Sequence, residues 1–112
     1  MTLKEYINEC YFGHPPDSVM PGVYVLGFMA GADDFEPSYV GRGDDDVLAR
    51  AKFGLAMRRE EGHRRQVSHW CFRVFASAEE AYEEECQIYN ALLSSDFCLN
   101  RAHPTPPGKS GA

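Results

Sequence analysis

The chain has 112 residues, of which 44% are hydrophobic and 25% are charged. This composition is typical of one compact domain and not of a disordered chain. The formal net charge of −6 argues against indiscriminate DNA binding. No apolar run approaches the roughly 20 residues needed to span a bilayer. The N-terminus lacks the apolar segment of a signal peptide, so we expect a cytoplasmic protein with no membrane partner.

The N-terminal part of the sequence predicts a helix and then a hairpin. Residues 2–5 have a capping-box pattern, and the apolar residues that follow have helical spacing that ends before Gly13. The apolar, β-prone residues 22–28 predict a strand, and residues 38–41 predict a second one. Residues 30–37 are rich in turn-forming types and predict a connection between them. A hairpin is the simplest pairing of these two strands.

The rest of the sequence predicts helix, strand and helix. Three acids at 44–46 favour a helix start, and a glycine after two glutamates at 60–62 ends that helix. Alternation over residues 69–76 predicts a third strand. A capping box at 77–80 opens a last helix that runs to about Leu93. The element order predicts an α/β fold in which a small three-stranded antiparallel sheet is flanked by helices, with one helix added at the N-terminus.

We expect a single domain over residues 1–103, because no internal repeat or linker divides it. Residues 104–112 contain too much proline and glycine to pack as an element, so they predict a flexible tail. Four cysteines occur without any CxxC pair, which favours free thiols in or near the core over a zinc site.

Several short motifs occur in a fixed order on the predicted elements. They are Gly22-Val23-Tyr24, Tyr39-Val40-Gly41, Arg50 on the middle helix, Glu85 four positions after Ala81, and Asn100 shortly before His103-Pro104. The ordered set resembles the GIY-YIG nuclease superfamily, and the resemblance covers residues 22 to about 103. It implies a metal-dependent endonuclease that hydrolyses DNA phosphodiester bonds.

The resemblance also implies a role for each matching residue. Tyr24 would be the general base or would position the attacking water, and Tyr39 would bond water or phosphate beside it. Arg50 would hold the scissile phosphate, and Glu85 would be the carboxylate ligand of Mg²⁺ or Mn²⁺. Asn100 would be a structural residue or would lie near the metal.

The substrate implied by the resemblance is DNA, in stand-alone members often branched or damaged. Residues 42–73 hold eight basic and five acidic residues, a charge pattern that is compatible with a local basic surface on an acidic chain. Arg42 matches a position that is often basic in the family. The other candidates for binding the substrate are Arg58, Arg59, Arg64 and Arg65, which could also be a solvated helix face.

The chemistry explains why such residues would converge. A phosphodiester gathers negative charge in its transition state, and an arginine with a hard cation can offset it. Mg²⁺ keeps several of its waters, so one carboxylate is sufficient anchorage. A free tyrosine has a pKa of about 10 and is a poor base at neutral pH unless a nearby cation favours the phenolate.

Other interpretations remain open at this point. The two tyrosines could be ordinary strand aromatics. Family members usually carry His or Tyr at the position of Gly54, which supplies no functional group, so the chain could be a binding module for nucleic acid or protein that has lost catalysis. The motifs could also have arisen by chance in an unrelated small α/β domain.

Overall fold

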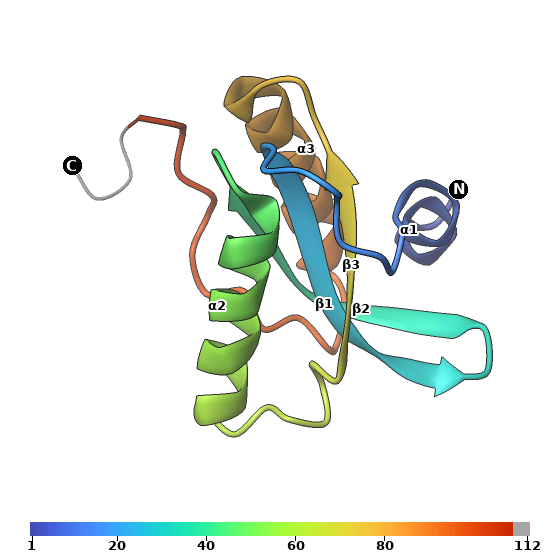
Figure 1. Ribbon diagram of the computed structural model, residues 1–112. Coiled ribbons are helices and arrows are strands. Elements are labelled where there is room, and N and C mark those ends of the chain that lie inside the picture. The colour runs from blue at the N-terminus through green and yellow to red at the C-terminus, as the bar shows by residue number, and fades with distance from the viewer. Residues whose placement is uncertain (109–112) are drawn as a thin grey trace.

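The structure, a computed structural model, describes residues 1–108 of the chain. Its elements are α1 (Leu3–Cys10), β1 (Gly22–Gly31), β2 (Asp34–Gly43), α2 (Val47–Glu60), β3 (His69–Val74) and α3 (Ala78–Leu92). β1 is the central strand and pairs antiparallel with both β2 and β3 (Figure 1). This confirms the predicted α/β class with a three-stranded antiparallel sheet and an added N-terminal helix. Within the described residues, no helix is both long and apolar enough to cross a bilayer.

The predicted hairpin of β1 and β2 is present, but its strands are longer than expected. The predicted connection over residues 30–37 is wrong, because residues 32 and 33 alone form the turn. Phe35 is buried in the core, which holds the start of β2 in extended conformation. Pro37 is compatible with this position because β2 is an edge strand, where a missing N–H donor is tolerated. Burial therefore outweighs the local turn preference.

The three helices start where their capping residues predict. Thr2 and Glu5 form the reciprocal capping box of α1. Asp46 is the N-cap of α2, and Ser77 is the N-cap of α3. Each cap satisfies a backbone N–H that has no partner within the first helical turn.

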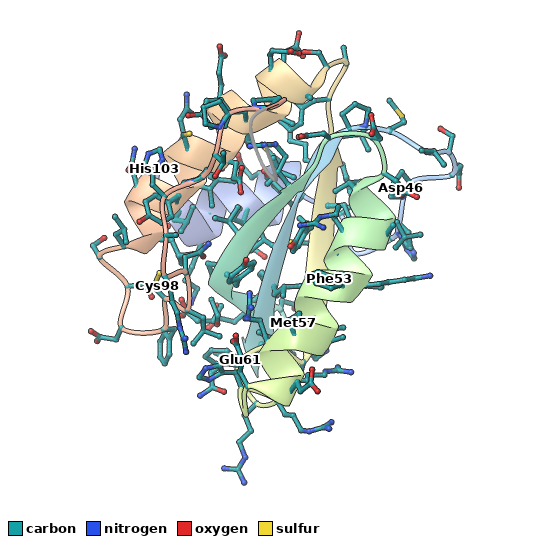
Figure 2. The ribbon with its side chains drawn as sticks, turned by 90° about the vertical axis from the view of Figure 1, so that its left-hand side faces the viewer. Asp46, Phe53, Met57, Glu61, Cys98 and His103 are labelled. Atoms are coloured by element: carbon teal, nitrogen blue, oxygen red, sulfur yellow. The ribbon has the colours of Figure 1, made fainter. Side chains whose placement is uncertain are left out.

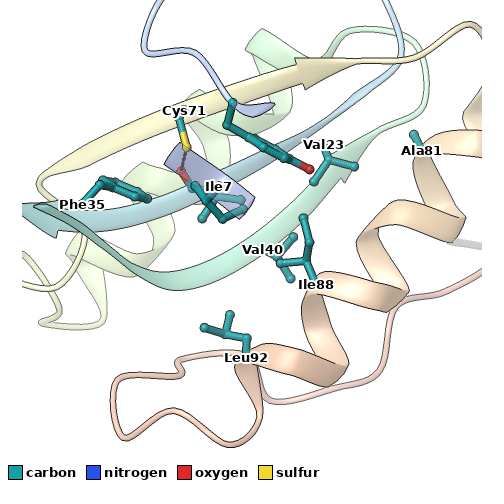
Figure 3. Close-up of a cluster of buried hydrophobic side chains, with 10 residues drawn as sticks. Ile7, Val23, Phe35, Val40, Cys71, Ala81, Ile88 and Leu92 are labelled. Carbon is teal, nitrogen blue, oxygen red and sulfur yellow. Dashed lines mark hydrogen bonds between the residues drawn. The ribbon is translucent and has the colours of Figure 1, made fainter. Parts of the chain in front are cut away.

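Alternation along β1 builds two cores on opposite faces of the sheet. Val23 and Val25 pack with α1 and α3 in the cluster shown in Figure 3. Tyr24 and Leu26 point to the other face and pack with α2. The phenol of Tyr24 is therefore directed at α2 by its place in the strand.

A polar network joins α1, β3 and α3 on the face of the sheet opposite α2. The buried Glu84 Oε2 accepts hydrogen bonds from Tyr6 at 2.6 Å, Tyr11 at 2.9 Å and Arg73 at 3.2 Å. Arg73 also donates to the Tyr6 hydroxyl oxygen. Three donors thus compensate the one buried carboxylate and fix α1 against the sheet.

The segment after α3 runs along the free edge of β2. The Asn100 side chain accepts a bond from Val40 N and donates one to Val40 O, each 2.9 Å long. The backbone N–H of Leu99 donates to Ser38 O at 2.7 Å. Residues 104–108 contain no helix or strand. The remainder of the predicted tail, residues 109–112, lies outside the described part of the chain.

Candidate functional site

An open pocket of about 660 Å³ lies at the β2 edge of the sheet, where α2 and α3 approach it. Figure 2 shows this side of the molecule, with α2 on one flank of β2 and the segment of Cys98 and His103 on the other. The residues that line the pocket are Tyr24, Tyr39, Gly41, Arg42, Asp44, Asp45, Asp46, Ala49, Arg50, Glu85 and Thr105. Tyr24, Tyr39, Arg50 and Glu85 come from four different elements and meet here.

Tyr24 is held between two glycines. A Cβ on Gly41 of β2 would lie 2.2 Å from the Tyr24 hydroxyl oxygen, and a Cβ on Gly54 of α2 would lie 2.5 Å from the same atom. Real Cβ atoms do not approach other atoms so closely, so both positions require glycine while the ring stays where it is. Gly54, which the sequence interpretation treated as supplying nothing, provides the space for the phenol of Tyr24.

The surroundings of Tyr24 keep its phenol protonated at neutral pH. The residue is only 4% exposed. Burial raises its pKa above the ordinary value, Tyr39 and Glu85 raise it further, and Arg50 and Arg58 lower it in part. The ring of Tyr39 stacks beside it with centroids 6.3 Å apart. Without a bound cation, Tyr24 therefore acts as a hydrogen-bonding group and not as a base.

Arg42 positions the carboxylate of Glu85. Its Nη1 donates to Glu85 Oε1 at 2.7 Å, its Nε donates to Asp44 at 2.5 Å, and its Nη2 donates to the Thr105 carbonyl at 2.7 Å. Each guanidinium nitrogen therefore has a partner within the protein. In this arrangement Arg42 orients Glu85, and its predicted role in binding the substrate is less well supported than its role as a positioning residue.

Glu85 lines the pocket and is only 8% exposed. Burial raises its pKa to about 7, although the charge and hydrogen bond of Arg42 act in the opposite direction. The other oxygen of Glu85, Oε2, has no hydrogen-bond partner within residues 1–108. Ser38 Oγ is the one side-chain polar atom there that is both unpartnered and sealed from solvent, so Glu85 Oε2 is not sealed. The free oxygen of Glu85 is therefore open to the pocket.

These residues fit a hard divalent cation. The lining carries four carboxylates and two guanidinium groups, so it would repel a phosphate unless a cation were bound. Among residues 1–108, no group of three or more His, Cys, Asp or Glu is arranged to hold a metal ion. A cation beside Glu85 would thus take one protein oxygen and keep most of its waters, as Mg²⁺ commonly does.

Arg50 is the cation of the pocket that is available to a ligand. It is exposed on α2, one turn after the N-cap, and it makes no ion pair within the described residues. Its guanidinium lies 5.3 Å from the ring centre of Phe53. An unpaired guanidinium at a pocket wall can offer two parallel N–H groups to a phosphate.

The remaining predicted residues lie outside this lining. The guanidinium of Arg58 lies 4.6 Å from the ring centre of Tyr39 and is paired with Glu61. Arg59, Arg64 and Arg65 do not line the pocket. Asn100 uses its amide to close the edge of β2 beside Tyr39 and Gly41, which supports the structural alternative for this residue.

Sequence reasoning missed the residues that shape the pocket without reacting. Gly54 had a detectable signal, because glycine in a helix interior costs about 1 kcal/mol relative to alanine and usually marks a close approach. The acids at 44–46 were interpreted as helix capping alone, yet all three line the pocket. Thr105 contributes through a backbone carbonyl, which no side-chain pattern reveals.

The fold and the pocket define a small α/β domain with a polar site at one sheet edge. Comparisons with protein families, curated proteins and solved structures found no match to this chain.

Proposed function

We propose that this protein is a metal-dependent endonuclease that hydrolyses DNA phosphodiester bonds, as the resemblance to GIY-YIG nucleases implies. The observation that carries the proposal is the shared pocket of Tyr24, Tyr39, Arg50 and Glu85. These residues are as many as 61 positions apart in the sequence. Two phenols, an unpaired guanidinium and a carboxylate with one open oxygen can together position a water, a phosphate and a cation for phosphodiester hydrolysis.

Each side chain has a defined task in this proposal. Arg50 binds a non-bridging oxygen of the scissile phosphate and stabilises the charge that develops there. Glu85 would hold Mg²⁺ or Mn²⁺ through Oε2. When bound, the cation neutralises phosphate charge and lowers the pKa of a water ligand. Tyr24 orients the attacking water through its hydroxyl, and Tyr39 bonds the water or the phosphate beside it.

The experiment is a cleavage assay on duplex, branched and single-stranded DNA with Mg²⁺ or Mn²⁺. We expect strand cleavage that Glu85→Gln and Arg50→Lys each reduce by about 100-fold or more, the usual scale for losing one group that stabilises the transition state. Glu83→Gln is the matched control, because Glu83 is exposed on the same helix and does not line the pocket. Metal-independent cleavage, or equal activity of Glu85→Gln and the wild type, would contradict the proposal.

A second candidate is a binding module on the same fold that has lost catalysis. The ion pair of Arg42 with Glu85 and the raised pKa of Glu85 favour it, because both weaken the attraction of this carboxylate for a cation. This candidate predicts salt-sensitive DNA binding without turnover through Arg58, Arg59, Arg64 and Arg65. Binding that ignores salt and survives reversal of these charges would exclude it for nucleic acid and leave a protein partner.

A further inference from the structure

One large aromatic side chain stands exposed beside the pocket. Phe53 is 56% exposed on α2. It lies one helical turn after Ala49 and Arg50, both of which line the pocket. Figure 2 labels Phe53 along α2 on the side of the molecule described above. The position supports no core packing, because the buried residues of α2 are Val47, Ala51 and Gly54.

The helix that carries this ring has a positive net charge. Helix α2 carries Arg50, Lys52, Arg58 and Arg59 against the single acid Glu60, although the whole chain has a net charge of −6. Arg64 and Arg65 follow directly and are exposed. An exposed aromatic ring beside an unpaired arginine can bind single-stranded nucleic acid through base stacking and phosphate contacts together.

From this surface we propose that Phe53 stacks on an unpaired nucleobase next to the phosphate held by Arg50. The inference rests on the proposed function and names its substrate class: DNA with unpaired nucleotides, such as a single strand, a flap or an extruded base. A base within a duplex has neighbours stacked on both faces, so its face is not available to a protruding ring. The substrate site thus extends from the pocket along α2.

The distances agree with this arrangement. Arg50 and Phe53 are three residues apart, which is about 4.5 Å along the axis of α2. The Arg50 guanidinium lies 5.3 Å from the ring centre of Phe53, on one of its sides. Arg50 can therefore bind the phosphate while Phe53 stacks on the neighbouring base.

The test separates stacking from phosphate binding. Anisotropy titrations measure the affinity of the full chain for a single-stranded thymidine oligomer. A chelator is present so that the oligomer is not cleaved. A second oligomer has the same length and phosphates but abasic sugars throughout. We expect Phe53→Ala to weaken binding of the thymidine oligomer by about 10-fold, within the range measured for aromatic–base stacking. It should leave the abasic oligomer unchanged, and Phe53→Trp should retain affinity for thymidine.

The matched control is Phe12→Ala. Phe12 is 66% exposed and bridges β3, at the sheet edge opposite the pocket. Equal losses for both oligomers in Phe53→Ala would show that the ring only positions Arg50, and would overturn the inference. Thymidine binding that Phe53→Ala leaves unchanged would also overturn the inference.

The failure of this inference and the failure of the proposed function are distinguishable. Stacking without any DNA cleavage would retain the inference and reject the nuclease. Cleavage of fully paired duplex that is indifferent to Phe53→Ala would retain the nuclease and reject the inference.

Discussion

Replacing Gly54 by alanine tests how the pocket holds Tyr24. The added Cβ would lie 2.5 Å from the Tyr24 hydroxyl oxygen and 3.1 Å from Cζ. The ring cannot retreat toward β2, because the backbone of Gly41 already leaves no room for a Cβ on that side. The phenol of Tyr24 must therefore leave its position between the two glycines, or α2 must move away from the sheet.

Two opposing effects set the size of the change. Alanine gains about 1 kcal/mol over glycine in a helix interior. Overpacking a filled site costs about 1–3 kcal/mol. We therefore expect Gly54→Ala to lower the free energy of unfolding by up to about 2 kcal/mol and to reduce DNA cleavage, because Tyr24 is displaced.

A double-mutant cycle with Tyr24→Phe isolates the contact. The phenylalanine lacks the oxygen that makes the shortest clash, so in that background Gly54→Ala should cost less or even stabilise by up to about 1 kcal/mol. Urea unfolding of the four proteins measures the coupling, expected at about 1–2 kcal/mol. An identical effect of Gly54→Ala in both backgrounds would refute the steric explanation.

Substitutions at Glu84, Glu85 and Asn100 test three other parts of the structure. Glu84→Ala removes a buried carboxylate that accepts from three donors, of which the hydroxyl of Tyr11 is buried. Urea unfolding should show a loss of about 3 kcal/mol, and a loss under about 1 kcal/mol would contradict the network. When a chelator removes divalent cations, the pKa of Glu85 in the folded state is about 7, above the ordinary value of 4.5. Stability relative to Glu85→Gln should thus fall as pH rises from about 4.5 to 7, whereas a flat or rising difference would show that this carboxyl is not desolvated. Asn100→Ala removes two bonds to Val40, so hydrogen exchange at Val40 should accelerate and stability should fall by about 1–2 kcal/mol; unchanged exchange would show that β2 does not need this clamp.

Local signals were sufficient for most of the fold. Thr2, Asp46 and Ser77 mark their helix starts by capping chemistry that acts within one turn, so the sequence alone reveals it. The length of the hairpin was mispredicted because Phe35 is held by contacts with distant residues of the core. Those contacts override the turn preference of its neighbours.

The candidate site was less accessible to sequence reasoning. The tyrosines and Glu85 were suggested by a resemblance, and alternation along β1 explains only why Tyr24 faces α2. That Arg42 would hold Glu85 instead of facing a ligand depends on β2 and α3 lying side by side at that register. The exposure of Phe53 could not be inferred either, since the apolar spacing of α2 does not show which face the sheet covers.

The proposed endonuclease activity depends most directly on a divalent cation binding at the open oxygen of Glu85. Anomalous diffraction from crystals of the protein grown with Mn²⁺ measures this. We predict a peak about 2.1 Å from Glu85 Oε2, within the pocket that Tyr24 and Arg50 also line. Density for Mn²⁺ elsewhere, with Glu85 still bound to Arg42 alone, would contradict the account.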